Sequence, residues 1–158
     1  MPTSSTWTRT PSLPDAVLDL RNVSHPADAV RGALGLRPHP EGGSFREVHR
    51  DTPAGGGRGA VTSILFLLAA GERSHWHRVD AAEIWLWQAG APLSLEVSGA
   101  GPVQLGPGRG EQLQFTVPPH AWQSARSEGA WTLVSCVVAP AFDYAGFELA
   151  PPGWSPPP

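Results

Sequence analysis

The sequence predicts a mainly β fold, an antiparallel sandwich or barrel with one short helix near its start. Glycine and proline supply 18 residues each of the 158, and they separate apolar runs of strand length. Several runs alternate apolar and polar residues, as strands with one buried face do. Short strands joined by such turns are typical of antiparallel sandwiches and barrels. A small barrel of this kind has an interior wide enough for one small ligand.

The first predicted elements are an N-terminal arm and a helix. Residues 1–23 begin with serine, threonine and proline and carry only a weak apolar pattern, so we expect an arm that docks on the domain or on a partner subunit. A helix is expected over residues 24–36, because Pro26 suits a first helical turn and Gly35 suits a helix end. The apolar residues between them form one stripe.

A strand is predicted directly after the first pair of glycines. Its alternation places Phe45, Glu47 and His49 on one face and two arginines on the other. A carboxylate and an imidazole on one strand face can line a pocket, or they can be edge-strand charges that discourage aggregation. Residues 51–59 contain three consecutive glycines and are expected to form a flexible loop.

Further strands complete the predicted domain. Residues 60–70 are a near-continuous apolar run, typical of a central strand buried on both faces. Residues 99–110 are rich in glycine and proline and indicate a turn region. The remaining strands are expected at residues 92–97, 111–117 and 131–139, and residues 118–125 are expected to form a sharp turn into a strand.

The predicted domain ends with aromatic residues and a proline-rich tail. Residues 142–149 contain the aromatic side chains needed to pack back on the sheet. We expect one domain over residues 24–150 and a disordered tail over residues 151–158.

The composition excludes several classes of function. All 11 basic residues are arginines, which excludes Schiff-base lysine chemistry and the P-loop lysine. The net charge of -3 argues against a nucleic-acid partner. Cys136 is the single cysteine, so no intrachain disulfide can form. No signal-like or membrane-length apolar run is present, so we expect no membrane partner and a cytoplasmic protein.

One stretch concentrates chemistry-bearing residues. His75 and His77 are two residues apart, which places both on one face of a regular strand. A turn over residues 78–82 would return Glu83 beside them on the neighbouring strand. Two imidazoles and a carboxylate suit a first-row transition metal. The alternative is a solvated hairpin with these residues as surface polar groups.

These residues resemble the cupin superfamily, in which His-x-His is followed by Glu, six residues and Gly, here ending at Gly90. Within it the chain is similar to the small, uncharacterised DUF985 or cupin-5 proteins over residues 26–150. The segments that carry this likeness are Leu34-Gly35-Leu36, Pro38-His39-Pro40-Glu41-Gly42-Gly43, Phe45-Arg46-Glu47, His77-Arg78-Val79, Glu83-Ile84-Trp85, Val117-Pro118, Trp122-Gln123, Phe142-Asp143-Tyr144 and Phe147-Glu148-Leu149. The resemblance implies a double-stranded β-helix, or jelly roll, and a homodimer, for which the N-terminal arm is a candidate swapped element.

The chain also departs from the cupin pattern. Gln123 stands where a fourth ligand histidine is usual, His120 stands where glycine is usual, and Leu86 stands where relatives commonly have histidine. The candidate metal ligands are therefore His75, His77, Glu83 and Gln123. Fe, Mn, Ni and Zn all tolerate such a set. Whether a metal or no cofactor is used stays open.

Without a metal, the same residues can transfer protons. A histidine beside a carboxylate forms a general-base pair for a proton next to a carbonyl, and cupin epimerases and ketoisomerases that act on nucleotide-linked sugars use such chemistry. His75 or His77 would be the base. Tyr144 is a candidate acid, or it packs at the barrel end, and Glu47 is a further catalytic candidate.

Aromatic and polar residues are predicted to form the walls of a ligand pocket. Trp85 and Trp87 share the strand face of Glu83, where they would line the pocket or fill the core. The other candidate ligand-binding residues are Phe45, His49, His120 and Gln123. Arg46, Arg73 and Arg78 could hold a carboxylate or phosphate by a bidentate fork.

Three functions fit these observations. The first is a small-molecule enzyme, with isomerase or epimerase-type proton transfer or metal-assisted chemistry inside the barrel, in small-molecule biosynthesis. The second is a cupin that binds a small ligand without catalysis. The third is a metal-dependent oxygenase or lyase.

Overall fold

The predicted helix forms over a shorter range. In the computed structural model, which describes residues 18–157, helix α1 spans Ala27–Leu34. Pro26 precedes it as the N-cap, and Gly35 ends it in the left-handed conformation with φ 63°. Most of the predicted N-terminal arm, residues 1–17, lies outside the described residues, as does Pro158 at the end of the tail.

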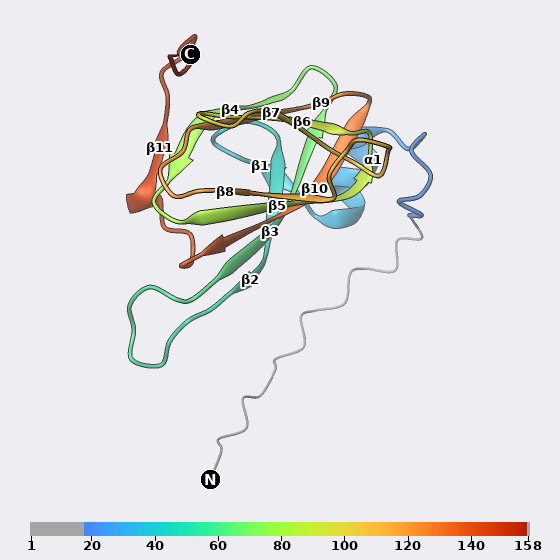
Figure 1. The fold of residues 1–158 in the computed structure, drawn as a ribbon. Helices are drawn as coiled ribbons and strands as arrows, with labels where there is room; N and C mark the ends of the chain where they lie inside the picture. The colour runs from blue at the N-terminus through green and yellow to red at the C-terminus, as the bar shows by residue number, and fades with distance from the viewer. Residues whose placement is uncertain (1–17, 158) are drawn as a thin grey trace.

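The strands form two antiparallel sheets that face each other (Figure 1). The six-stranded sheet has the order β1-β2-β3-β10-β5-β8, and the five-stranded sheet has the order β11-β4-β9-β6-β7. The strands are β1 (Arg37–Pro38), β2 (Ser44–Arg50), β3 (Thr62–Ala69), β4 (Arg73–Val79), β5 (Ala82–Gly90), β6 (Leu93–Val97), β7 (Gly101–Leu105), β8 (Gln114–Val117), β9 (Gln123–Ser127), β10 (Trp131–Ala139) and β11 (Phe147–Leu149). A 3-10 turn, η1 (Tyr144–Gly146), precedes β11.

The turn between β4 and β5 carries the chain from one sheet to the other. β4 pairs with β9 and β11, whereas β5 pairs with β10 and β8. Glu83 on β5 therefore reaches His77 on β4 across the space between the sheets. The expectation of two neighbouring strands in one hairpin was wrong.

One strand lies in the region predicted as turn. β7 forms between residues 101 and 105 and pairs with β6. Val103 and Leu105 alternate inward and are buried, so this short segment has a strand pattern despite its flanking glycines.

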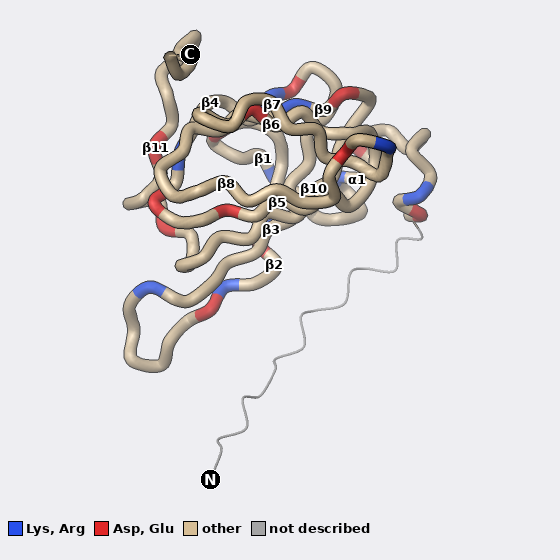
Figure 2. Tube along the Cα trace, viewed as in Figure 1, with Lys and Arg blue, Asp and Glu red and all other residues tan. Residues whose placement is uncertain are grey.

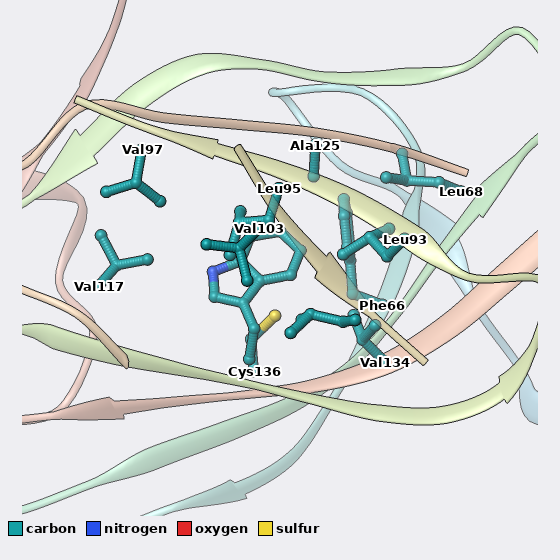
Figure 3. Packing of buried hydrophobic residues seen from close by; sticks show 12 residues of the cluster. Phe66, Leu68, Leu93, Leu95, Val97, Val103, Val117, Ala125, Val134 and Cys136 are labelled. Carbon is teal, nitrogen blue, oxygen red and sulfur yellow. The ribbon is translucent and has the colours of Figure 1, made fainter. Parts of the chain in front are cut away.

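The hydrophobic core fills one end of the space between the sheets. Its buried cluster includes Phe66, Trp85, Leu93 and Leu95, and Figure 3 shows its side chains from both sheets pointing toward one another. Cys136 belongs to this cluster and also lines the cavity described below, so it marks the boundary between them. The core thus leaves the other end of the barrel for a site.

Helix α1 covers the outer face of the six-stranded sheet. Val30 and Leu34 pack there with Leu67 and Trp131. The outward side of β3 is therefore buried as well, which confirms the prediction that this strand is buried on both faces.

Two β-bulges change which side chains point inward. In β4, Ser74 pairs with Ala125 and His77 with Gln123, so three steps along β4 match two along β9. In β2, the register also shifts between Glu47 and His49. A bulge adds one residue and reverses the alternation of the side chains beyond it.

Trp154 in the proline-rich tail, predicted to be disordered, packs on Trp122, with ring centroids 4.4 Å apart. Acidic and basic positions are spread around the chain (Figure 2). Across residues 18–157, no helix has the length and apolar character needed to span a membrane.

Candidate active site

A cavity of about 130 Å³ opens at the end of the barrel that the core leaves free. Both sheets contribute to its walls, together with the loop between β1 and β2 and the turn η1. Its apolar lining residues are Phe45, Ile64, Val79, Val138, Phe142 and Phe147. Its polar lining residues are Arg37, His39, Glu41, Glu47, Arg50, Thr62, His77, Glu83, Cys136 and Tyr144.

Glu83 is a buried carboxyl in this cavity, with 7% of its surface exposed. Gln123 donates a hydrogen bond from Nε2 to Oε2 of Glu83 at 2.6 Å, and the Cys136 thiol is a second hydrogen-bond partner. Burial raises the pKa of Glu83 to about 7, because the charged form loses its hydration; the Glu41 carboxyl adds to the rise and His77 opposes it. Glu83 can therefore exchange a proton near neutral pH.

Trp85 fixes the orientation of the Gln123 amide. The indole Nε1 donates to Oε1 of Gln123 at 2.8 Å, so the amide nitrogen is the atom that faces Glu83. Trp85 thus lies beneath the site but does not line the cavity. Trp87 also packs against the core, with its Nε1 donating to the carbonyl of Ala91, so the predicted aromatic pocket walls are core residues instead.

His77 presents one nitrogen to the cavity. Its Nδ1 lies 2.8 Å from the backbone carbonyl of His75, and a carbonyl only accepts, so Nδ1 carries the proton. In the neutral ring Nε2 is then a free acceptor, and it lies 3.4 Å from Oε2 of Glu41. Burial lowers the pKa of His77, which favours this neutral form.

Glu41 is a buried cavity residue that the sequence analysis did not select. Ser74 donates from Oγ to its Oε1 at 2.8 Å, and burial raises its pKa. Its loop is held because His75 N–H donates to the Glu41 carbonyl at 2.8 Å. The loop also needs Gly42, since a Cβ there would lie 2.1 Å from the carbonyl oxygen of Arg73. The sequence feature that could have indicated Glu41 is its place between Pro40 and the two glycines Gly42 and Gly43, since such a tight loop can turn a carboxylate toward the domain.

His39 supports the same loop. Its Nδ1 accepts a hydrogen bond from the Glu41 backbone N–H at 3.2 Å and lies 3.6 Å from Oε2 of Glu41. Burial lowers the pKa of His39, so this ring is also favoured in its neutral form. Sequence analysis did not select His39 for the site.

The β4 bulge separates the two histidines of the motif. His77 is buried in the cavity, whereas the side chain of His75 is exposed on the outside of the barrel. The prediction that both share one strand face was wrong, because the extra residue breaks the alternation between them. His75 contributes only its backbone to the site.

The predicted metal ligands do not fit a metal ion. His75 points away, and the amide oxygen of Gln123, its ligating atom, is already bound by the Trp85 indole. In the part of the chain that the structure describes, no group of three or more His, Cys, Asp or Glu side chains is arranged to hold a metal. His77 and Glu83 remain in the cavity as buried ionisable groups.

The β2 bulge changes the predicted face of that strand. Phe45 and Glu47 line the cavity as expected, but His49 does not, and Arg50 lines it instead. Arg50 donates to the Glu47 carboxylate, with Nη2 to Oε2 at 2.7 Å, and from Nη1 to the carbonyl of Phe142 at 2.9 Å. Glu47 is thus paired with a cation at the cavity mouth.

Of the remaining predicted site residues, Tyr144 lies at the rim of the cavity and His120 lies outside it. Tyr144 lines the cavity with 57% of its surface exposed. His120 is exposed in the turn before β9 and has φ 65°, the conformation that explains why glycine is usual at this position.

The three arginines predicted to hold an anion do not line the cavity. Arg73 pairs with Glu96, and Arg78 pairs with Glu148. Arg46 lies on the other strand face from Phe45, near the end of α1, where its Cδ is 3.9 Å from the position of a Cβ on Gly35.

The comparisons with known proteins agree with this architecture. The family model described as Cupin superfamily (DUF985) matches residues 29–150. Protein SO0799 from Shewanella oneidensis is 36% identical, with a TM-score of 0.74 over 80% of this chain and 85% of its own. A hypothetical protein from Leishmania major is 35% identical, with a TM-score of 0.71 over 78% of this chain and 86% of its own.

More distant solved structures share the fold alone. KdgF from Halomonas sp. is 16% identical, with a TM-score of 0.54 over 70% of this chain and 91% of its own. The DMSP lyase DddQ from Ruegeria pomeroyi is 18% identical, with a TM-score of 0.58 over 81% of this chain and 68% of its own. The search of curated proteins gives no match. The family model and the two closer structures together show that this chain belongs to the cupin superfamily, in its DUF985 family.

Proposed function

We propose that this protein is an enzyme that transfers a proton on a small organic molecule in the barrel cavity, as an isomerase or epimerase does. The observation that carries the proposal is that Glu41, His77 and Glu83 are all buried around one cavity. Buried ionisable groups cost free energy, and they gather where acid-base chemistry is performed. Each is held by hydrogen bonds that fix its orientation.

The three groups have complementary roles in this proposal. The Glu83 carboxylate takes the proton from a carbon next to a carbonyl, and the electron pair of the broken C–H bond moves to the carbonyl oxygen. The Glu41 carboxyl, kept protonated by burial, donates a hydrogen bond to that oxygen. With no ligand in the cavity the single O–H of Glu41 points to Nε2 of neutral His77, and it turns to the substrate oxygen when a ligand binds. On an α-hydroxy ketone, Glu83 then returns its proton to the former carbonyl carbon, while the Glu41 carboxyl gives its proton to the former carbonyl oxygen and takes the proton of the neighbouring hydroxyl, so the product is an isomer.

The fold is compatible with this kind of function. A DMSP lyase shares it, so a cupin barrel can house catalysis on a small molecule. The competing function is binding without catalysis. A binding protein needs shape and a few polar contacts, and it has no use for a carboxyl that titrates near pH 7.

Deuterium incorporation tests the proposal without knowledge of the natural substrate. A panel of small oxo acids, hydroxy ketones and keto sugars is incubated with the protein in D2O, and the carbon-bound deuterium is measured by mass spectrometry. We expect incorporation into at least one compound by the natural protein and by Glu128→Gln, which removes an exposed glutamate far from the cavity. Glu83→Gln should not catalyse it.

The outcomes separate the two functions. Incorporation that is lost only in Glu83→Gln supports proton transfer. A compound that binds to both the natural protein and Glu83→Gln with equal affinity, and gains no deuterium with either, would show a binding protein instead.

A further inference from the structure

At the mouth of the cavity, one arginine is paired with a carboxylate and another is not. Two arginines line the cavity, Arg37 and Arg50. The guanidinium of Arg50 is occupied by Glu47 and by the carbonyl of Phe142. Arg37 forms no ion pair with any carboxylate of residues 18–157. The mouth therefore contains one guanidinium whose charge no described protein group balances.

The backbone and an aromatic ring direct Arg37 toward the cavity. Arg37 on β1 pairs in register with Phe45 on β2, a residue of the cavity wall. Its guanidinium carbon lies 5.2 Å from the centroid of the Phe45 ring. His39 packs edge-on against the same ring, with centroids 4.6 Å apart, and holds it in place. A guanidinium stacked on a ring keeps its N–H edge free for a bidentate ligand.

The buried part of the cavity, away from the exposed Arg37, suits a neutral, polarisable group. Glu41 and Glu83 lie there, and both are buried. The Glu83 carboxylate would repel a negative charge beside it, so an anionic group of a ligand must lie at the mouth. The apolar side chains of Ile64 and Val138 also line the cavity. The cavity thus favours a ligand with one charged end and one reactive end.

We infer that the substrate is a small carboxylate, whose carboxylate group binds Arg37 at the mouth while its reactive carbon lies next to Glu83. The inference rests on the proposed function for the identity of the reacting end, but not for the anion site. A single free guanidinium balances one negative charge, and its two parallel N–H groups match the two oxygens of a carboxylate. A phosphate group presents the same kind of oxyanion with more charge.

Matched pairs of small ligands test this site by binding alone. The probes are propionate and lactate, each with its primary amide, which has the same shape without the charge, and inorganic phosphate. Their dissociation constants are measured by ligand-observed NMR with the natural protein, with Arg37→Gln and with Arg109→Gln. Arg109 lies in an exposed turn outside the cavity, so its variant changes the net charge equally.

We expect the natural protein and Arg109→Gln to bind each carboxylate at least about tenfold more tightly than its amide, as charge-assisted bidentate bonds favour. In Arg37→Gln the ratio should fall to about one while the amides bind as before. Equal binding of carboxylates and amides, no binding of any carboxylate, a preference that survives in Arg37→Gln, or tighter binding of phosphate would each overturn the inference.

The same measurement on Glu83→Gln keeps this inference separate from the proposed function. Glu83→Gln should retain the carboxylate preference, because Arg37 is unchanged. If the preference is present and no compound gains deuterium, the anion site stands and proton transfer fails. If deuterium enters a carbonyl compound while Arg37→Gln changes no affinity, proton transfer stands and the carboxylate inference fails.

Discussion

Nε2 of His77 lies 3.4 Å from Oε2 of Glu41, and both residues are buried. Because Nδ1 of His77 donates to the carbonyl of His75, Nε2 of the neutral ring has a free lone pair. Burial favours a protonated Glu41 and a neutral His77, so the pair holds one proton between a carboxyl oxygen and an imidazole nitrogen. Glu83 lines the same cavity, and in the proposed function it is the second acid-base group.

The two histidines of the motif should differ sharply when each is replaced. His77→Gln should lower the rate of deuterium exchange by about 100-fold or more, because it removes the partner of Glu41. His75→Ala should leave the rate unchanged, because only the backbone of His75 contacts the site. Exchange rates of both purified variants check this. A large loss in His75→Ala would return this side chain to the active site.

Much of the fold could be predicted from the sequence, but the site could not be predicted to the same extent. Alternation placed the strand at residues 92–97 where β6 forms, and Gly35 marked the end of α1. The same period-two alternation failed at the bulges, since an inserted residue leaves no clear mark in the pattern. His75 and His49 were consequently assigned to the cavity, and Arg50 was assigned to the opposite face.

Glu41 was missed for a different reason. It lies in a loop, where no periodicity indicates the direction of a side chain. It reaches the cavity only because its loop packs on β4, where the His75 N–H binds its carbonyl. Arg37 was missed as well, because a two-residue strand is too short to show alternation.

Replacement of Gly42 should disturb the site through its loop. Gly42 has φ 106°, and a Cβ there would meet the Arg73 carbonyl oxygen at 2.1 Å, so Gly42→Ala should lower the free energy of unfolding by about 2 kcal/mol or more. Gly55→Ala is the matched control, because open space surrounds that position. Urea denaturation of both variants measures the difference. Equal stability of the two variants would contradict the close packing of the loop on β4.

The pKa of Glu83 predicts how stability changes with pH. Its pKa is raised from 4.5 to about 7 on folding, so between these values the folded state binds more protons than the unfolded state. Stability from this group is therefore lost as pH rises from 4.5 toward 7, by up to about 3 kcal/mol. His77 acts in the opposite direction, because its pKa is lowered.

The contribution of Glu83 is isolated by comparison with Glu83→Gln. The difference in unfolding free energy between the natural protein and this variant should shift in favour of the variant as pH rises through this range. Denaturant titrations at several pH values measure it. A difference that is independent of pH would mean that Glu83 has an ordinary pKa.

Removal of metal ions should not affect the reaction. Because His75 and the Gln123 amide oxygen are directed away from Glu83, the proposed proton transfer uses only side chains of the chain itself. Exchange rates before and after dialysis against a chelator should agree within error. A loss of activity that added Fe, Mn, Ni or Zn restores would contradict this account, and elemental analysis would identify the ion.

The most direct test of proton transfer is the rate at which deuterium from solvent enters a carbon-bound position, compared between the natural protein, Glu83→Gln and the control Glu128→Gln. We expect incorporation by the natural protein and the control, and a rate at least about 100-fold lower for Glu83→Gln, because the group that accepts the proton is gone. Equal incorporation by all three proteins would show that Glu83 is not the base.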